Sequence, residues 1–251
     1  MFEDKLTDLV NIIKSSKNTV FFGGAGVSTE SNIPDFRSEA GLYEAEKKYG
    51  YSPEEMLSRN FFIHHRTEFF KYYKENLIHL EARPNKAHEV LAKLEEMSLL
   101  SAVITQNVDG LHQAAGSKNV IELHGANSEQ YCIKCGQGFS VNYILDDANC
   151  KDLVPLCPCG GVVRPDIVLY GETLKESVLI AAISAIASAD CLIVGGTSLV
   201  VYPAAGLINY FRGKNLVLIN KAKTGADGFA GLVIHHSIGE VLSSVMLKLR
   251  H

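Results

Sequence analysis

Three polar side chains stand directly after apolar, strand-like runs, and their types suit chemistry on a bound nucleotide. Asn107 and Asp109 follow the run 102–105, and His124 follows the run 120–123. Ligands of open parallel sheets bind beyond the carboxyl ends of the strands, so we expect these side chains to converge there. A histidine suits the role of general base, because its ordinary pKa lies near neutral pH.

A glycine-rich loop follows an earlier apolar run, and it departs from the fingerprint of dinucleotide-binding dehydrogenases. Gly24 and Gly26 match the first two glycines of that fingerprint, but Thr29 stands where the third belongs. The segment "IPDFR" follows almost at once, and no acidic residue stands at the distance expected of a ribose ligand. The loop therefore predicts a nucleotide site for chemistry other than hydride transfer.

Four of the six cysteines form two closely spaced pairs, which predicts a structural zinc site. Cys132 and Cys135 make a C-x-x-C knuckle, and Cys157 and Cys159 make a shorter C-x-C knuckle before two glycines. Four thiolates fill the tetrahedral coordination of zinc and leave no position for water, so the site would be structural. Cys150 could replace one ligand, and unligated thiols are the alternative for the whole set.

Apolar runs alternate with helical patterns over most of the chain, which predicts a doubly wound α/β fold with a parallel, Rossmann-like sheet. The expected strands are 19–22, 102–105, 120–123, 167–169, 191–194 and 216–219. The expected helices are an amphipathic one near the amino terminus and those at 86–99, 175–188, 203–211 and 239–249.

Two intervals interrupt this alternation and predict a smaller lobe. Residues 40–81 show helical patterns only, and residues 127–165 have little helical pattern and hold the paired cysteines. We expect both to be inserts that pack together, one a helical module and the other a zinc-ribbon module. The expected sheet domain consists of residues 1–39, 82–126 and 166–251.

Composition and charge give no reason to expect nucleic acid or an anionic membrane as a partner. The formal net charge is −4, and the amino terminus lacks the pattern of a secretory signal. The stretch 191–211 is uncharged and long enough to cross a bilayer, but Gly195, Gly196 and Pro203 within it favour a buried strand, a loop and a helix start. We therefore expect a cytoplasmic protein that binds neither nucleic acid nor membrane.

Six features, in order along the chain, resemble the signature blocks of the sirtuin family of NAD-dependent protein deacylases. They are "GAGVSTESNIPDFR", "TQNVDGLH", "ELHG", the paired cysteines, "VRPDIVLYGE" and "GTSLVVYPAA". The resemblance covers nearly the whole chain, and it is closest to single-domain bacterial members. It implies that NAD is a co-substrate and that one structural Zn²⁺ is bound. Acetylated proteins or peptides, bound by strand addition, would be the partners.

The resemblance also implies a mechanism. The carbonyl oxygen of an acetyl-lysine would attack the carbon that bears nicotinamide, and nicotinamide would leave as an alkylimidate forms. His124 would then act as general base on the ribose hydroxyls, so that the 2′-oxygen attacks the imidate. The products would be deacetylated lysine, nicotinamide and O-acetyl-ADP-ribose.

Site residues carry over from the resemblance position by position. Catalytic roles would fall to His124, Asn107 and Asp109. The residues expected to contact NAD are Gly24, Ala25, Gly26, Thr29, Asp35, Phe36, Arg37, Gln106, Asn107, Val108, Asp109, His124, Gly196, Thr197, Ser198, Asn220, Lys221 and Ile238. The substrate peptide is expected to add as a strand to the edge formed by Val168, Tyr170, Gly171 and Glu172.

Each site residue also has a plainer interpretation, and the function has rivals. His124 could be a core histidine, Asp109 could cap a short helix, Phe36 could be core and Arg37 could pair with an acid. Rival functions are NAD hydrolysis or ADP-ribosyl transfer on the same fold, and an ADP-ribose-binding module without catalysis. The cysteine insert favours peptide substrates, and the polar residues around His124 favour catalysis.

Two positions bear on how closely the resemblance holds. Asn32 stands where relatives have glycine, and asparagine tolerates the left-handed backbone that such a turn needs. The segment "FFKYYKENL" has tyrosines but no arginine three residues from one. The family members that prefer acidic acyl groups carry that pair, so we expect acetyl or other uncharged acyl groups here.

Overall fold

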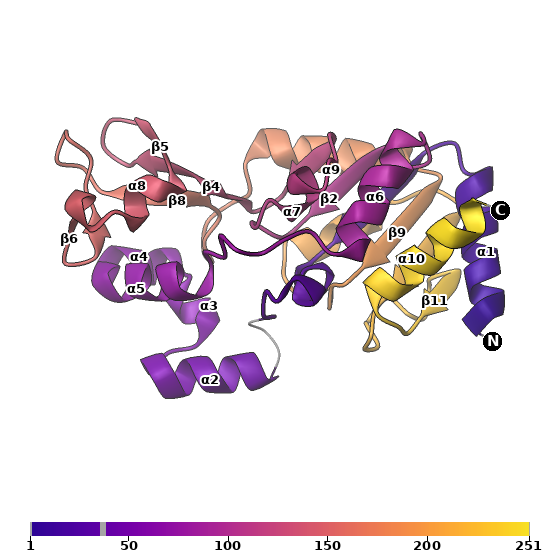
Figure 1. The fold of residues 1–251 in the computed structure, drawn as a ribbon, viewed down its shortest axis with the longest axis horizontal. Helices are drawn as coiled ribbons and strands as arrows, with labels where there is room; N and C mark the ends of the chain where they lie inside the picture. The colour runs from indigo at the N-terminus through magenta and orange to yellow at the C-terminus, as the bar shows by residue number, and fades with distance from the viewer. Residues whose placement is uncertain (1, 36–38, 251) are drawn as a thin grey trace.

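The protein is seen in a computed structural model that describes residues 2–35 and 39–250, with only the backbone described at 39–42 and 44 (Figure 1). Its centre is a six-stranded sheet in the order β11-β10-β9-β1-β2-β3. The strands are β1 (Thr19–Gly23), β2 (Ala102–Thr105), β3 (Val120–Glu122), β9 (Cys191–Gly195), β10 (Asn215–Ile219) and β11 (Leu232–Ile234). All neighbours pair in parallel, which confirms the predicted fold class.

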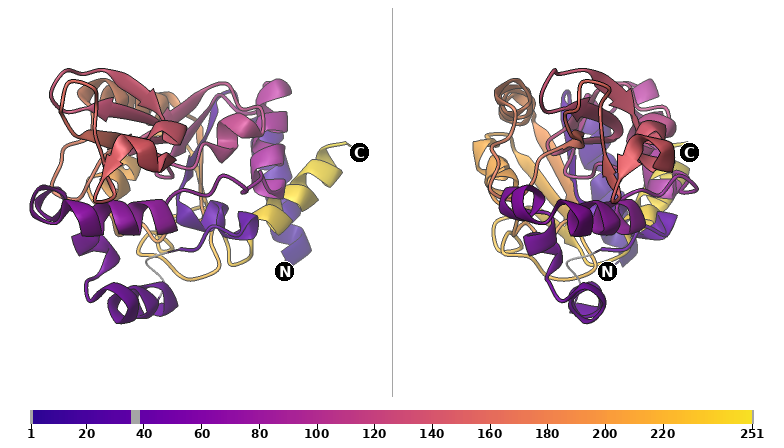
Figure 2. Two further views of the ribbon diagram at one scale, coloured as in Figure 1. Left: turned by 60° about the vertical axis from the view of Figure 1, so that its left-hand side comes forward. Right: turned by 90° about the vertical axis from the view of Figure 1, so that its left-hand side faces the viewer.

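Helices cover both faces of this sheet, as its continuous apolar strands require (Figure 2). One face packs against α1 (Phe2–Ser15), α6 (Lys86–Glu96) and α10 (Ile238–Leu249). The other face packs against α9 (Glu176–Ser188) and the 3₁₀ helix η4 (Ala204–Tyr210). Phe21 points to the first layer and Phe22 to the second, because successive side chains of a strand face opposite ways.

The smaller lobe consists of the two inserted segments, which share one core. Its helical part contains α2 (Glu39–Tyr49), α3 (Pro53–Met56), α4 (Arg59–His64) and α5 (Arg66–Asn76). Its other part contains β4 (Gly125–Cys132), β5 (Gly138–Ser140), α8 (Val141–Leu145), η3 (Asp147–Asn149), β6 (Cys150–Lys151), β7 (Val154–Pro155) and β8 (Val163–Ile167). Buried aromatic side chains of α4 and α5 pack against Ile144, Val163 and Ile167. Because the lobe has its own core, we propose that the chain divides into a sheet domain and a smaller lobe.

The sequence misassigned one strand of the central sheet and missed another. Residues 167–169 were expected there, but β8 ends at Ile167 and pairs antiparallel with β4 in a second, three-stranded sheet. The short apolar run was ambiguous, since the core of the lobe buries it as fully as a parallel sheet would. The sixth central strand, β11, is a three-residue strand that the sequence reading did not assign.

Two helical predictions also differ from the structure. The expected helix at 203–211 is the 3₁₀ helix η4, which contains Gly206, a residue of low helix propensity. The predicted helix 86–99 ends earlier, with α6 at Glu96, because the chain turns through a positive φ at Ser98.

We predict that Gly125→Ala destabilises the protein by about 2–4 kcal/mol, because alanine disfavours positive φ and overpacks the site. Gly125 has a φ of 77°, and an added Cβ would overlap the carbonyl oxygen of Asp166 on β8. Urea denaturation measures the change. Gly138→Ala is the matched control, since nothing lies within 4 Å of its added Cβ. Equal midpoints for Gly125→Ala and the unmodified protein would contradict the prediction.

Candidate functional site

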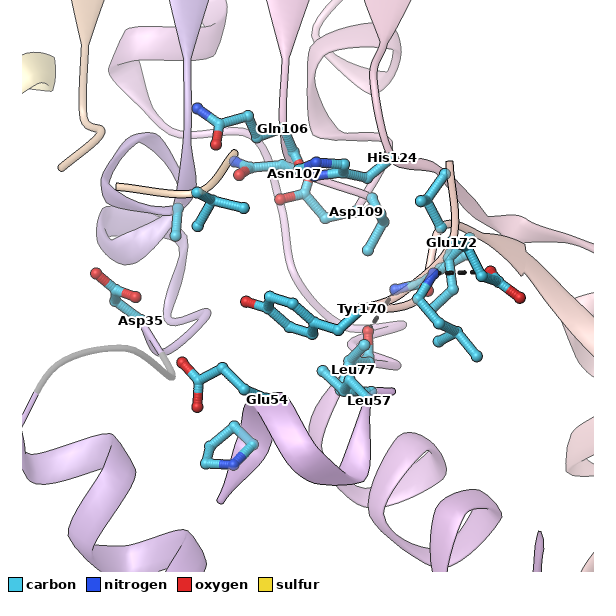
Figure 3. Close-up of a pocket in the computed structure, with 18 of the residues that line it drawn as sticks. Asp35, Glu54, Leu57, Leu77, Gln106, Asn107, Asp109, His124, Tyr170 and Glu172 are labelled. Atoms are coloured by element: carbon cyan, nitrogen blue, oxygen red, sulfur yellow. Dashed lines mark hydrogen bonds between the residues drawn. The ribbon is translucent and has the colours of Figure 1, made fainter. Parts of the chain in front are cut away.

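A cavity of about 220 Å³ lies between the carboxyl ends of the central strands and the smaller lobe (Figure 3). The strand order of the central sheet reverses between β1 and β9: β2 and β3 lie on one side of this point, and β10 and β11 lie on the other. Ligands of open α/β sheets bind at such a switch point. The sheet domain contributes Ala25, Ser28, Gln106, Asn107, Val108, Asp109, His124 and Val201–Pro203. The inserted lobe and the chain just beyond it contribute Pro53, Glu54, Leu57, Leu77, His79, Asn127, Ile167–Glu172 and Leu174.

Asn107 and Asp109 converge on Ser28, which sequence reasoning had not singled out. Asn107 Nδ2 donates to Ser28 Oγ at 3.0 Å, and Ser28 Oγ donates to Asp109 Oδ2 at 2.7 Å. Ser28 is only 1% exposed, whereas Asn107 and Asp109 are half-buried, so both hydrogen bonds are partly shielded from water and hold the two side chains in place. Asp109 Oδ1 also accepts from the backbone N–H of Leu111, so it caps the short helix α7 (Leu111–Ala114) as well.

His124 is half-buried at the end of β3, and its ring orientation is set by one backbone group. Nδ1 lies 2.9 Å from the carbonyl oxygen of Gln106. A carbonyl can only accept, so this hydrogen bond places the proton on Nδ1 and makes Nε2 the ring nitrogen that can take up a proton. The carbonyl of His124 accepts from Val168 N at 2.9 Å, which joins the histidine to the smaller lobe.

The loops after β1 and β9 touch through their backbones, and glycine makes this approach feasible. Gly26 N donates to Gly196 O at 2.8 Å. An added Cβ on Gly26 would lie 2.9 Å from Gly196 O, and one on Gly24 would lie 2.9 Å from Thr197 Cβ. Gln106 Nε2 donates to Thr197 Oγ1 at 3.0 Å, so Gln106 braces the two loops from within. The structure thus brings together the expected nucleotide residues of these loops.

Other expected NAD contacts lie apart from this cavity. Ser198 and Lys221 are exposed, and Asn220 donates through Nδ2 to Ala222 O at 2.9 Å. Ile238 begins α10 and packs near Gly195, at the carboxyl end of β9. These four residues lie beyond the ends of β9 to β11 and do not line the cavity that contains His124. Thr29 is half-buried near the cavity, and its hydroxyl donates to Gly26 O at 3.0 Å.

The segment after Pro34 is only partly described. Asp35 lines the cavity, and Figure 3 shows its carboxylate on the same side as that of Glu54 and the hydroxyl of Tyr170. Phe36 and Arg37, both expected to contact NAD, lie outside the described residues. The helical pattern of the lobe gave no signal that Glu54 would reach the site.

Backbone hydrogen bonds at Val168 and Tyr170 anchor the expected peptide edge. Tyr170 N donates to Leu57 O at 3.0 Å, and Tyr170 O accepts from the backbone N–H that begins α4 at 2.9 Å. Together with the bond from Val168 N to His124 O, these contacts connect the edge to the helical module and to β3. Val168, Tyr170, Gly171 and Glu172 therefore stand at the junction of the lobe and the sheet.

Glu172 braces this edge from behind. Its carboxylate points away from His124 and Tyr170 in Figure 3 and binds the Arg164 guanidinium through contacts of 2.6 Å and 3.0 Å. The same carboxylate accepts from Leu169 N at 2.9 Å. Burial raises the pKa of Glu172, but the hydrogen bonds from Arg164 and Leu169 outweigh it and hold that pKa below its ordinary value.

The four paired cysteines gather into one cluster that fits a zinc ion. Their Sγ atoms all lie within 4.8 Å of one another. Cys132 and Cys159 are 3.5 Å apart at sulfur, and Cys135 and Cys157 are 3.7 Å apart. A tetrahedral zinc with bonds of about 2.3 Å places its sulfurs about 3.8 Å apart. Cys150 lies outside the cluster, where its Sγ accepts from Lys74 Nζ at 3.4 Å, so the geometry offers the two knuckles as a complete set of four thiol ligands.

The uncharged stretch 191–211 folds as the sequence suggested, into β9, a loop and η4. Among the residues that the structure describes, no helix has the length and apolar character needed to cross a membrane.

Comparisons with known proteins agree over nearly the full length of the chain. Residues 24–203 match the model of the Sir2 family. An NAD-dependent protein deacetylase of Clostridium acetobutylicum is 54% identical over 244 residues, which cover 97% of this chain and 98% of the relative. A solved Sir2 structure with a p53 peptide and NAD⁺ has a TM-score of 0.88 and 41% identity, covering 97% of this chain and 98% of the other. A Sir2 histidine-to-alanine variant with a deacetylated p53 peptide and 3′-O-acetyl ADP ribose has a TM-score of 0.89 and 42% identity, with the same coverage.

We predict that the purified protein contains about one equivalent of zinc, and that Cys135→Ser lowers this below half an equivalent and lowers the melting temperature. Removing one thiolate leaves an open, weaker tetrahedral site, and the lobe loses the metal that joins its two knuckles. Metal analysis by mass spectrometry and thermal melting measure both effects. Cys150→Ser is the control and should keep its zinc. Equal zinc loss in both variants would show that the ligand set is wrong.

Proposed function

The chain belongs to the Sir2 family, and from that membership we propose that it is an NAD-dependent protein-lysine deacetylase. The reaction removes acetyl groups from protein lysines and yields deacetylated lysine, nicotinamide and O-acetyl-ADP-ribose. One observation carries the proposal: a single cavity joins the glycine-rich nucleotide loop, His124 and the edge on which a peptide can add. NAD would supply the ribose carbon that the carbonyl oxygen of the acetyl-lysine attacks, and nicotinamide would leave from that carbon.

His124 acts as the general base of this reaction. The Gln106 carbonyl holds the proton on Nδ1, so Nε2 receives the proton of a ribose hydroxyl in the cavity. A proton acceptor is needed only where the ribose oxygen itself becomes a nucleophile. This requirement distinguishes a deacetylase from a module that only binds ADP-ribose.

Asn107 and Asp109 orient the nicotinamide end of NAD. Their hydrogen bonds to buried Ser28 fix both side chains before the substrate arrives, which lowers the entropy that must be lost to reach the reacting geometry. Asp35 and Val108 line the same part of the cavity and complete the proposed nicotinamide site. Asp109 and Ser28 come from different strand ends, so the site is complete only in the folded chain.

The remaining NAD contacts are assigned by position along the crevice. Gly24, Ala25, Gly26 and Thr29 surround the pyrophosphate, because backbone N–H groups at a helix start favour anionic oxygens. Gln106 braces the loops beside the ribose. Phe36 and Arg37 lie outside the described residues, and the family resemblance alone assigns Phe36 to the ribose and Arg37 to the phosphates. The adenosine half lies against Gly196, Thr197, Ser198, Asn220, Lys221 and Ile238, beyond the ends of β9 to β11.

The acyl group is uncharged. Within the described residues, no lysine or arginine lines the cavity, whereas the carboxylates of Asp35 and Glu54 do. Asn127, a polar residue of the cavity wall, is already paired: Tyr73 donates to Asn127 Oδ1 at 2.9 Å, and Asn127 Nδ2 donates to Leu77 O at 2.6 Å. His79 also lines the cavity, and its Nε2 lies 2.8 Å from Asn76 O. The described lining residues therefore offer no lysine or arginine to compensate a carboxylate carried in on an acyl chain.

The peptide edge and the cysteine cluster favour a protein substrate, which disfavours plain NAD hydrolysis. NAD hydrolysis needs no strand edge beside the ribose, whereas a protein substrate does. The cluster also holds four reduced thiols, which accords with the cytoplasmic location that we propose.

We expect nicotinamide and O-acetyl-ADP-ribose to form in equal amounts when NAD and an acetyl-lysine peptide are both present, and nicotinamide release to fall at least tenfold without peptide. His124→Ala should lower kcat about 10²–10⁴-fold, the range for loss of a general base, while the Kd for NAD stays within about threefold. His64→Ala, on the exposed end of α4, is the control. Nicotinamide release at the same rate without peptide would refute the deacetylase, and loss of NAD binding in His124→Ala would refute the role of that histidine.

We also expect kcat/KM for a succinyl-lysine peptide to be at least about 100-fold below that for the acetyl-lysine peptide. Such a ratio corresponds to about 2.7 kcal/mol, the order of the cost of an uncompensated carboxylate facing Asp35 and Glu54. A propionyl-lysine peptide of the same sequence is the control for size and should react within about tenfold of the acetyl peptide. Equal rates for succinyl and propionyl peptides would overturn the uncharged-acyl assignment.

A further inference from the structure

A second hollow, of about 420 Å³, lies beside the cavity and shares part of its wall. The shared residues are Ile167, Val168, Gly171 and Glu172, which include most of the proposed peptide edge. The other lining residues are Arg59, Tyr131, Arg164, Asp166, Thr173 and Lys175. A peptide that adds to this edge with its acyl-lysine in the cavity therefore passes the second hollow.

The charged side chains of this hollow comprise three cations and two anions. Arg164 is paired with Glu172 through two contacts, and Lys175 Nζ lies 2.6 Å from Asp166 Oδ2. Arg59 is exposed, and across residues 2–35 and 39–250 its guanidinium has no ion pair or hydrogen bond. The hollow therefore carries a net charge of +1, and among the described residues Arg59 is its one cation without a hydrogen-bonded acid. Arg59 also acts electrostatically on Glu172, but that carboxylate is already bonded to Arg164.

The backbone of Arg59 is fixed relative to the peptide edge. Its N–H donates to Tyr170 O at 2.9 Å, and Tyr170 N donates to Leu57 O at 3.0 Å. These bonds form a parallel bridge between Ser58 and Tyr170. Arg59 therefore extends into the hollow from a point that the edge itself determines, and it does not depend on a mobile loop.

We propose that the second hollow binds an acidic side chain of the substrate protein next to the acyl-lysine, and that Arg59 selects it. The inference rests on the proposed function, since it concerns the sequence around the modified lysine. A guanidinium matches a carboxylate through two parallel N–H···O bonds, whereas a cationic side chain at the same position would be repelled. The other two cations of the hollow already have partners, so Arg59 determines the preference.

The expected effect is modest, because Arg59 is exposed to solvent. Exposed ion pairs change an equilibrium roughly two- to fivefold, and salt screens them. The contact holds the flanking residue and not the reacting atoms, so it should appear in KM and leave kcat unchanged.

The test is a set of acetyl-lysine peptides with glutamate, alanine or lysine placed in turn at each position flanking the modified residue. At the position that faces the hollow, glutamate should lower KM roughly two- to fivefold relative to alanine, and lysine should raise it similarly. High salt should reduce both differences. Arg59→Ala should remove the preference, and Arg59→Glu should reverse it in favour of lysine.

Arg83→Glu is the matched control, since Arg83 is exposed and lies outside both hollows. It changes the net charge by the same amount and should leave the glutamate preference intact. Turnover of the alanine peptide at the unmodified kcat shows that each variant is folded.

The outcomes separate the inference from the function on which it rests. If acetyl peptides react but glutamate is not preferred, or Arg59→Ala keeps the preference, the inference is wrong and the deacetylase assignment stands. If no acetyl peptide reacts, the assignment fails, and fluorescence anisotropy with labelled peptides then decides the inference. A reversed preference in Arg59→Glu supports it, and equal binding of all peptides overturns it.

Discussion

The strand order of the central sheet reverses at β1, and every part of the site depends on that reversal. The chain places β2 and β3 on one side of β1 and β9, β10 and β11 on the other, so the loops that follow β1 and β9 bound a crevice. The backbone contact between Gly26 and Gly196 keeps the floor of this crevice narrow. A side chain at either glycine would push the loops apart, so the absence of a Cβ is itself part of the site.

The opposite wall comes from a lobe that is too small to rely on a large core. Its aromatic cluster is supplemented by the four-cysteine cluster and by the buried pair of Arg164 and Glu172. Small modules commonly need such additional links, because they bury little apolar surface. The peptide edge is bonded to Leu57 on one side and to His124 on the other, so its position depends on both inserts and on β3 together.

Two sets of hydrogen bonds orient the polar side chains of the cavity. The Gln106 carbonyl sets which nitrogen of His124 can take up a proton. Ser28 holds Asn107 and Asp109 in a buried network whose members come from the ends of β1 and β2. The first set bears on the proposed proton transfer, and the second fixes the side chains of the proposed nicotinamide site.

The sequence by itself determined the features that depend on residues close together in the chain. Five of the six central strands could be placed from apolar runs, since burial on both faces leaves a continuous signal in each strand. Three short motifs could also be identified from the sequence, because each has a fixed spacing. They are the cysteine pairs, the glycine loop and the residues after β2 and β3. Only the tertiary structure decided that Ser28 is the partner of Asp109, that Glu172 braces the edge through Arg164, and that Arg59 stands beside that pair without a hydrogen-bonded acid of its own among the described residues. The Ser28 contact joins residues 81 positions apart, and neither residue type reveals its partner until the chain has folded and water has left.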